Sequence, residues 1–478
     1  MNEIKRERNL DPLFRPKSIA IIGASESGLY PAGVLRNLLR YGYQGKIFPV
    51  NPRRETVQGL KSYSKILDIE EDVDLAVIVV PRGFVLDILD QCEKKGVKAV
   101  VIITAGFGEA DEYGKELQKK MVEFTKRTGI MICGPNTAGF ANVREKIPVI
   151  ARFDPPPIPG NVAFVSQSGA LMMALYGVFA DKSVGLSFIA STGNQVDLEV
   201  SECMRYFVED ENTKVIAAFV EGFSKISNFI ETADLALMKG KPIIILKVGR
   251  TEVGAAAALT HTGSLTGSDE VYDAVFKQKG IIRVNDVDEL VDTAKVFSLF
   301  IDRAPEGDGV AVITQSGGMG SLTADLCGAY GLNLPELSGK TLERLVSMDE
   351  LLTFGSLRNP ADVRGEGTRA RTLPNVLEPL IEDEKYSYIV ILLARPAVGG
   401  EDIETARTIV ELSKNITKPI LVVWVGRKVP DPGSDLDSQP YRILEKSGVP
   451  VFYNPGSCLK ALKHLIDYVK FRKRRVGR

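Results

Sequence analysis

The sequence alternates short, fully apolar runs with amphipathic stretches, and this alternation constrains the fold more than any other feature. In the first third, apolar runs such as SIAIIGAS, LAVIVVP and AVVIITAG are separated by amphipathic stretches such as AGVLRNLLRYG. Continuous apolar runs are typical of strands buried on both faces of a parallel sheet, whose crossovers are helices. We therefore expect residues 1–148 to form a Rossmann-like α/β domain.

Two further series of the same kind follow the proline-rich stretch ARFDPPPIPGN. The second begins with NVAFVSQSGALMMALYG and the third with GVAVITQSGGMGSLTADLCGAYG, so both open with an apolar run, Gln-Ser-Gly, a helical stretch and Tyr-Gly. This similarity predicts two related flavodoxin-like domains with parallel sheets, at residues 149–300 and 301–478. Three domains also suit a chain of 478 residues, because a domain has about 100–200 residues.

Charge and cysteine usage exclude several classes of function. The formal net charge is -1, which predicts neither a nucleic-acid partner nor binding to an anionic membrane, and the basic end KFRKRRVGR is interpreted as a solvated terminus. The five cysteines are scattered without a CxxC motif, so we expect reduced thiols and no metal site. The charged N-terminus lacks a secretory signal and no long apolar run occurs, which predicts a cytoplasmic protein.

Ligands of parallel sheets bind where strands end, and the first such junction is AIIGASESGLYPAG. Its glycines would let backbone N–H groups approach a phosphate. The next strand runs into FPVNPRRE, with Asn51 and Arg53 where an NAD enzyme usually has an acidic residue for the ribose. This pattern favours a nucleotide with an extra phosphate, such as CoA. A simple tight turn and NADP binding by an oxidoreductase remain open alternatives.

Two more junctions carry candidate anion sites. In MICGPNTAGF we expect the chain to start a short helix at Asn136, whose free N–H groups would hold an anion, with a structural turn as the alternative. In VSQSGAL, the hydroxyl and small side chains of residues 166–171, at a helix start, could bind a carboxylate or an acyl phosphate. The near-copy at Gln315 makes the second signal less specific, because repetition of the fold would also explain it.

The stretch ALTHTGSLTGSD contains His261, one of only two histidines in the chain. It follows the apolar run KPIIILKVG, so it falls on a loop at the end of a strand, and it has no neighbouring metal ligands. A neutral imidazole can carry a covalent phosphoryl group when an acceptor orients its other nitrogen. Glu221, at the end of the run AAFV, is the candidate acceptor, although an ordinary solvated carboxylate is an equal alternative. His464 lies in a helical stretch and is interpreted as structural.

Eight motifs in one order resemble the α subunit of the NDP-forming acyl-CoA synthetases, the archaeal ADP-forming acetyl-CoA synthetases in particular, with succinyl-CoA synthetase as a more distant relative. They are GAS, GYQGKIFPVNP, CGPNTAGF, VSQSGAL, VEGF, LTHTGSLTG, ITQSGGMG and NPADV, and they extend over almost the whole chain. The resemblance implies a CoA-binding domain followed by two domains of the succinyl-CoA synthetase type. It implies that acyl phosphate and nucleotide phosphorylate His261 in turn, and that Glu221 orients the imidazole.

The resemblance also assigns ligand contacts. Those implied for CoA are Gly23, Ala24, Ser25, Lys46, Asn51, Pro52, Arg53, Pro81, Thr104, Ala105 and Gly106. Those implied for the phosphate or acyl group are Asn136, Thr137, Ser166, Gln167, Ser168, Gly169 and Gly263.

The three series leave no sequence for the ATP-grasp region that holds the nucleotide in relatives. The resemblance therefore implies a separate ATP-grasp β subunit that binds ADP or ATP with Mg²⁺ in an α2β2 assembly. In archaeal relatives this subunit also supplies a second phosphate-shuttling histidine. The expected reaction converts acyl-CoA, ADP and phosphate into a small carboxylic acid, CoA and ATP. A non-catalytic CoA-binding or regulatory protein of the same fold is the alternative.

Overall fold

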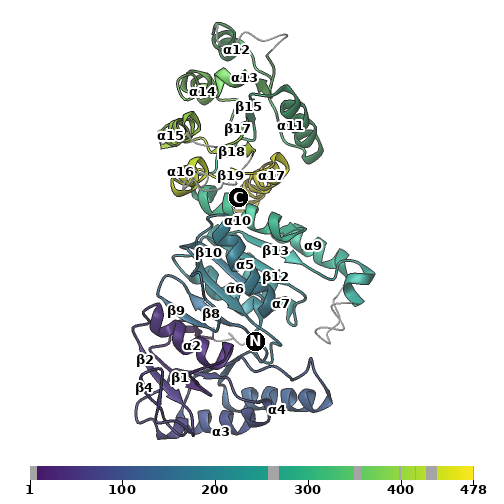
Figure 1. Cartoon of the computed structure of the whole chain (residues 1–478). Helices are drawn as coiled ribbons and strands as arrows, with labels where there is room; N and C mark the ends of the chain where they lie inside the picture. Colours follow the sequence, from purple (N-terminus) through teal and green to yellow (C-terminus); the bar gives the residue numbers. More distant parts are fainter. Residues whose placement is uncertain are drawn as a thin grey trace. The chain divides into compact units, whose positions relative to one another are not determined.

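The computed structural model describes residues 8–256, 268–348, 357–397, 400–414, 416–426 and 439–476. The chain divides into two compact units after Val287 (Figure 1). Each unit is built from mostly parallel sheets and helices, which agrees with the α/β class predicted from the apolar runs.

The first sheet has five parallel strands in the order β2-β1-β5-β6-β7. The strands are β1 (Ser18–Ile22), β2 (Lys46–Val50), β5 (Leu75–Ile78), β6 (Ala99–Ile102) and β7 (Met131–Cys133). The small hairpin β3 (Thr56–Val57) and β4 (Leu60–Lys61) follows β2, and the short helices η1 (Ile66–Asp68) and η2 (Arg82–Phe84) flank β5. Strand β2 lies on one side of β1, at the edge of the sheet, and β5 lies on the other side of β1. The direction in which successive strands are added therefore reverses between β1 and β5. Ligands of open α/β sheets bind at such a reversal.

Helices cover both faces of the first sheet because alternate strand residues point to opposite sides. Helices α3 (Val85–Lys95) and α4 (Glu112–Thr128) lie next to each other on one face, where their apolar sides pack on Ala20, Ala76 and Val100 (Figure 1). Helices α1 (Asp11–Phe14) and α2 (Leu29–Arg40) pack on the other face. Asp111 caps α4 by accepting the N–H of Gly114 at 2.7 Å, and this contact explains where the helix begins.

The second sheet has the order β14-β13-β12-β10-β11-β8-β9. Its parallel part is β10 (Pro159–Ser166), β11 (Leu186–Ser191), β12 (Val215–Val220), β13 (Ile243–Lys247) and β14 (Ile282–Val284). These five strands have the flavodoxin-like order 2-1-3-4-5, as expected. The antiparallel strands β8 (Gly139–Asn142) and β9 (Ile147–Ile150) extend the sheet beyond β11.

Strands β8 and β9 belong to the second sheet, so the boundary between the sheets lies earlier in the chain than the sequence suggested. The expected boundary after residue 148 falls inside β9, whereas the last strand of the first sheet ends at Cys133. The hydrogen bonds of β8 to β11 decide this assignment. Likewise, α10 (Val287–Phe300), expected to end the second domain, belongs almost entirely to the second compact unit.

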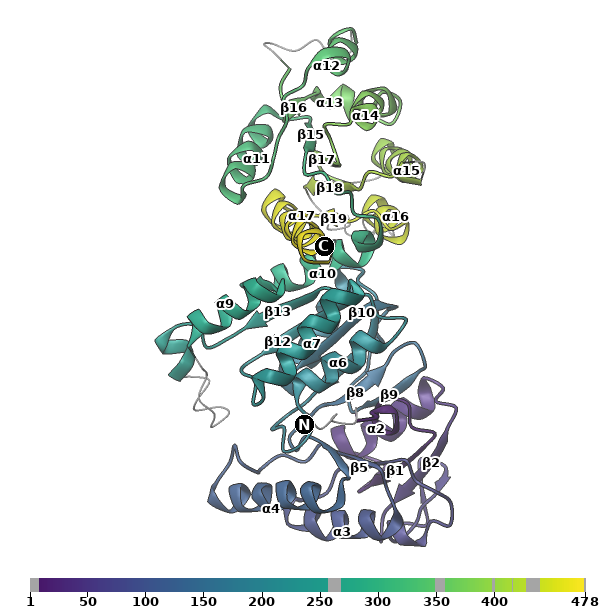
Figure 2. The ribbon, with the colours of Figure 1, turned by 180° about the vertical axis from the view of Figure 1, so that it is seen from behind.

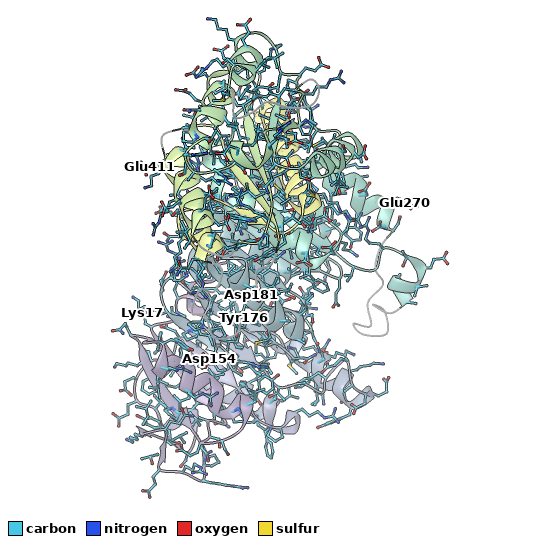
Figure 3. The ribbon with its side chains drawn as sticks, turned by 45° about the horizontal axis from the view of Figure 1, so that its top comes forward. Lys17, Asp154, Tyr176, Asp181, Glu270 and Glu411 are labelled. Carbon is cyan, nitrogen blue, oxygen red and sulfur yellow. The ribbon has the colours of Figure 1, made fainter. Side chains whose placement is uncertain are left out.

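Helices α6 (Val200–Glu209), α7 (Ile226–Lys239) and α9 (Asp269–Lys279) pack on one face of the second sheet, where α6 and α7 lie side by side (Figure 2). Helix α5 (Gly169–Asp181) lies against the sheet through Phe179, whose ring is 5.3 Å from that of Phe164. The proline-rich segment before β10 packs on α5, since the rings of Phe153 and Tyr176 are 6.3 Å apart. Figure 3 labels Asp154 on that segment and Tyr176 on α5.

One continuous apolar core joins the first two sheets. It contains Ile21 and Val101 of the first sheet together with Val165 and Ile216 of the second. Helix α2 also approaches β9 closely: a Cβ on Gly33 would lie 2.2 Å from the carbonyl oxygen of Ala151, so no larger residue fits there. The two sheets therefore form one unit, and their loops have fixed relative positions.

The second unit contains a third parallel sheet, with the order β16-β15-β17-β18-β19. Its strands are β15 (Val310–Thr314), β16 (Ala361–Asp362), β17 (Tyr388–Ala394), β18 (Ile420–Val425) and β19 (Val451–Phe452). Its helices, besides α10, are η3 (Ile301–Arg303), α11 (Gly317–Tyr330), α12 (Gly339–Val346), α13 (Arg364–Gly367), α14 (Leu373–Glu382), α15 (Glu401–Lys414), α16 (Gln439–Lys446) and α17 (Pro455–Val476). The order 2-1-3-4-5 recurs, which fits the expected second flavodoxin-like domain.

Candidate functional site

Loops from the first and second sheets surround a cleft of about 1310 Å³ in the first unit. The cleft includes the ends of β10 and β12, between which the order of the second sheet reverses. This is where the topology predicts a ligand site. The residues from the sequence analysis that line it are Thr104, Ala105, Asn136, Thr137, Gln167, Ser168, Gly169 and Glu221.

The start of α5 supplies an anion-binding surface to the cleft. Ser168 caps the helix by accepting the N–H of Leu171 at 3.3 Å. The N–H groups of Gly169 and Ala170, in the first turn, have no partner within the helix, and both residues line the cleft. These N–H groups and the helix dipole favour an anion such as phosphate or carboxylate.

Ser166 has a different role from the one expected of it. Its side chain is fully buried, and its hydroxyl donates to the carbonyl of Ser168 at 2.8 Å and accepts the N–H of Ser168 at 3.1 Å. It therefore shapes the turn into α5 and presents no hydroxyl to the cleft.

Gln167 holds the chain that carries Glu221. Its Nε2 donates to the carbonyl of Gly222 at 2.8 Å, and its Oε1 accepts the N–H of Gly222 at 3.1 Å and also the N–H of Glu221. The side-chain amide is thus engaged by backbone, whereas the sequence analysis assigned it to the phosphate or acyl group. Its position fixes Glu221 beside the start of α5, across the reversal between β10 and β12.

The expectation of a short helix at Asn136 was wrong. Asn136 adopts a positive φ of 59°, and the chain continues directly into β8. The N–H of Asn136 donates to the carbonyl of Thr104 at 2.9 Å, and the hydroxyl of Thr137 donates to the carbonyl of Ser191 at 2.6 Å. Because these groups bind neighbouring loops, the turn offers no free helix terminus. The helix start at this cleft belongs to α5 instead.

The loops predicted to hold CoA lie at the reversal of the first sheet. Residues 23–25 follow β1 and residues 51–53 follow the adjacent β2. The side chain of Asn51 joins them: its Nδ2 donates to the carbonyl of Ala24 at 2.8 Å, and its Oδ1 accepts the N–H of Arg53 at 2.9 Å. The structure thus brings Gly23, Ala24, Ser25, Asn51, Pro52 and Arg53 to one edge of the sheet.

Pro81 and Gly106 lie at the same edge, in the loops after β5 and β6. The hydroxyl of Thr104 donates to the carbonyl of Val80 at 2.7 Å, and Arg82 donates to the carbonyl of Gly106 at 2.6 Å. These bonds tie the two loops together next to the cleft.

Lys46 is the exception among the residues assigned to CoA. It is the first residue of β2 and pairs in register with Ser18, the first residue of β1. In a parallel sheet these positions are at the amino ends of the strands, opposite to the loops described above. The Lys46 ammonium lies 3.9 Å from a carboxylate oxygen of Glu71. The structure therefore separates Lys46 from the other predicted CoA contacts.

Further polar residues, which no sequence motif indicated, line the cleft. Glu109 follows β6, Gln118 and Lys119 lie on α4, and Asn194 follows β11. Glu109 and Asn194 could have been found from the sequence, because both follow a buried strand. Nothing in the sequence indicated that they contact each other.

A buried lysine lies behind the site. Lys247 ends β13, is 1% exposed and is aligned with Val220, the residue before Glu221. Its ammonium donates to the carbonyl of Val248 at 2.5 Å and lies 4.7 Å from the ring centroid of Tyr272. Burial lowers the pKa of Lys247, and the negative charges of Asp269 and Glu221 raise it in part.

His261 and Gly263 lie outside the described residues. His464 is on α17, where its Nε2 is 3.0 Å from Oε1 of Glu289 on α10.

Within the described part of the chain, no group of three or more His, Cys, Asp or Glu side chains is arranged to hold a metal ion. No helix in that part is both long and apolar enough to cross a membrane.

Comparison with known proteins identifies the family. A CoA binding domain matches residues 17–142, and a succinyl-CoA ligase like flavodoxin domain matches residues 159–297. Subunit alpha of acetate–CoA ligase (ADP-forming) I from Pyrococcus furiosus is 37% identical over 472 residues, which cover 97% of this chain and 98% of the relative. This chain belongs to the ADP-forming acetate–CoA ligase family.

The likeness to this ligase family extends to the structure. The Candidatus Korarchaeum cryptofilum dinucleotide forming acetyl-coenzyme A synthetase 1, solved in complex with phosphate and ADP, matches with a TM-score of 0.87 and 33% identity over 98% of each chain. The acetate–CoA ligase (ADP-forming) of Methanocaldococcus jannaschii is 38% identical over 97% of this chain but 64% of its own length. Some members of the family are therefore longer polypeptides.

Proposed function

We propose that this chain is the α subunit of an ADP-forming acid–CoA ligase, which converts an acyl-CoA, ADP and phosphate into the acid, CoA and ATP. The observation that carries the proposal is the site at the reversal of the second sheet, where the N-terminus of α5 and Glu221 line one cleft. Loops of the CoA binding domain line the same cleft. The names of the relatives support this reaction.

The proposed chemistry has three balanced steps. An oxygen of hydrogen phosphate attacks the thioester carbonyl, the C–S bond breaks, and the proton of the phosphate passes to the CoA sulfur, which leaves an acyl phosphate. An imidazole nitrogen of His261 then attacks phosphorus, the bond to the acyl oxygen breaks, and the acid leaves as a carboxylate. Finally a β-phosphate oxygen of ADP attacks phosphorus, the N–P bond breaks, and ATP forms.

The residues of this chain would act mainly by position and charge. The N–H groups of Gly169 and Ala170 would stabilise the phosphate oxygens during each transfer. Glu221 would accept the N–H of the other imidazole nitrogen of His261, which fixes the tautomer and makes the attacking nitrogen more basic. The loops at residues 23–25 and 51–53 would hold CoA.

We further propose that the nucleotide binds to a separate ATP-grasp β subunit, with Mg²⁺, in an α2β2 assembly. The α-subunit names of two relatives support a partner subunit, and the longer relatives are consistent with a fused arrangement. A cytoplasmic location remains the proposed compartment. It is supported by five free, buried cysteines, since reduced thiols persist there.

The test is labelling of the purified chain by [³²P]acetyl phosphate. We expect an acid-labile, base-stable phosphoprotein in the wild type and none in His261→Asn. Glu221→Gln should label more slowly while binding CoA as well as the wild type does, because the carboxylate acts on the imidazole alone. Equal labelling of His261→Asn would disprove the phosphohistidine, and an unchanged rate in Glu221→Gln would remove the orienting role.

A non-catalytic CoA-binding protein of the same fold predicts CoA binding without any labelling. A coupled assay of this chain with its co-expressed neighbour would then identify the acid. Acetate, branched, aryl and dicarboxylic acids are the panel to compare.

A further inference from the structure

One side-chain amide connects the loops of the two sheets across the cleft. Asn194 follows β11 of the second sheet, and its Nδ2 donates to Oε2 of Glu109 at 2.6 Å and to Oε1 of Gln118 at 2.9 Å. Glu109 lies in the loop after β6 of the first sheet, and Gln118 lies on α4. All three residues line the cleft.

The two acceptors of Asn194 also hold the loop after β6 in its conformation. The carboxylate of Glu109 accepts the N–H of Gly106 at 2.6 Å and that of Phe107 at 3.2 Å, and Oε1 of Gln118 accepts the N–H of Gly108 at 3.0 Å. Partial burial raises the pKa of Glu109, but the bonds from Asn194 and from these backbone groups lower it more. The carboxylate therefore stays ionised and holds both the loop and Asn194.

The backbone around Asn194 is anchored just as closely. Its N–H donates to the carbonyl of Pro135, in the loop after β7, at 2.9 Å. The preceding Gly193 has a φ of 58°, and a Cβ there would lie 2.2 Å from the same carbonyl oxygen. Only glycine allows this approach without displacement of one loop. Asn194 thus contacts the loops after β6 and β7 from the loop after β11 of the other sheet.

We propose that Asn194 is a positioning residue, which fixes the loop at residues 104–106 relative to the anion site at the start of α5. The inference rests on the proposed function, in which that loop holds the thioester end of CoA and α5 holds the attacking phosphate. The reacting atoms must lie about 3–3.5 Å apart, and a displacement of about 1 Å can cost up to about 100-fold in rate. The shared core fixes the two sheets relative to each other, and the direct bonds of Asn194 add a local restraint on the separation of these two loops.

The residue type matches this role. An asparagine amide supplies two N–H donors without charge, and here both are used on acceptors of the first sheet. Aspartate in its place would bring a second carboxylate against Glu109 and repel it. Exchange of the two groups, with aspartate at position 194 and glutamine at position 109, would restore a donor and an acceptor between these two positions but not the bond to Gln118.

The experiment compares two routes to the phosphorylated chain. Labelling by [³²P]acetyl phosphate needs the anion site alone, whereas labelling by acetyl-CoA plus [³²P]phosphate needs the thioester and the phosphate to be placed together. For Asn194→Ala we expect the second rate to fall about tenfold or more and the first to stay within about twofold. Asn333→Ala is the matched control, because its Nδ2 also donates to a carboxylate, that of Asp308, at 2.8 Å in the other unit.

The exchange variant separates positioning from general loss of structure. Asn194→Asp should be slower than Asn194→Ala by the acetyl-CoA route, and the double variant Asn194→Asp with Glu109→Gln should recover part of the rate. If Asn194→Ala slows labelling equally by both routes, or by neither, the inference is overturned, while labelling of the wild type still supports the proposed function. Absence of labelling in the wild type by either route would overturn both.

Discussion

Replacement of Gln167 by alanine should slow phosphorylation of the chain about 10- to 100-fold while the chain remains folded. The variant removes three hydrogen bonds, two with the backbone of Gly222 and one with the N–H of Glu221. Each such bond contributes about 0.5–1.5 kcal/mol net. Because these groups border the cleft, water replaces part of the loss, and we expect a decrease of about 1–2 kcal/mol in the free energy of unfolding.

The expected effect on rate is larger because Gln167 positions Glu221. Without the amide, the loop after β12 can shift, and a displacement of about 1 Å costs up to about 100-fold when geometry limits the reaction. A fall of 10- to 100-fold corresponds to about 1.4–2.7 kcal/mol in the activation free energy. A protein with about 5–15 kcal/mol of stability remains folded after the loss of 1–2 kcal/mol, so unfolding cannot explain such a decrease.

Rapid-quench labelling with [³²P]acetyl phosphate measures the rate, and thermal unfolding measures the stability. Gln44→Ala is the control, because the exposed Gln44 makes a single bond to the carbonyl of Gly42 at 2.8 Å, away from the cleft. Its labelling rate should equal that of the wild type. If Gln167→Ala loses stability as expected but labels at the wild-type rate, Gln167 has no positioning role.

Two further changes test the structure behind the cleft. Gly193→Ala should lower the free energy of unfolding by about 2–4 kcal/mol, since it adds a clash with Pro135 to the cost of a left-handed residue. Gly96→Ala, at a φ of 80° with no atom near its Cβ, should cost only about 1–2 kcal/mol in thermal unfolding; equal losses would contradict the assigned clash. Lys247→Met should be at least as stable as the wild type at pH 7, because burial lowers the pKa of Lys247 and makes its charge unfavourable in the folded state. The difference in the free energy of unfolding between the variant and the wild type should shrink as the pH rises toward about 10.4, where the unfolded lysine also loses its proton. A difference that grows with pH would refute the unfavourable charge of Lys247.

The sequence determined the fold class because its signals are local. An apolar run or an amphipathic period is set by neighbouring residues, so three series of strands and helices could be predicted from the chain alone. The strand ends then indicated where ligands bind, and Glu221, Ser168 and Gly169 do line the cleft. The position of Lys46 at the start of its strand was also readable from the sequence, and this position separates Lys46 from the other predicted CoA contacts.

Only the tertiary structure decided which groups meet. The bond between Gln167 and Gly222 joins residues 55 positions apart, and that between Glu109 and Asn194 joins residues 85 apart. The turn at Asn136 likewise follows from pairing of β8 with β11, which no local pattern shows. Apolar periodicity specifies that strands are buried, but sheet order and register specify which loops become neighbours. The sequence therefore determined where chemistry could occur, and the packing of the two sheets decided which side chains carry ligand and which hold the site in place.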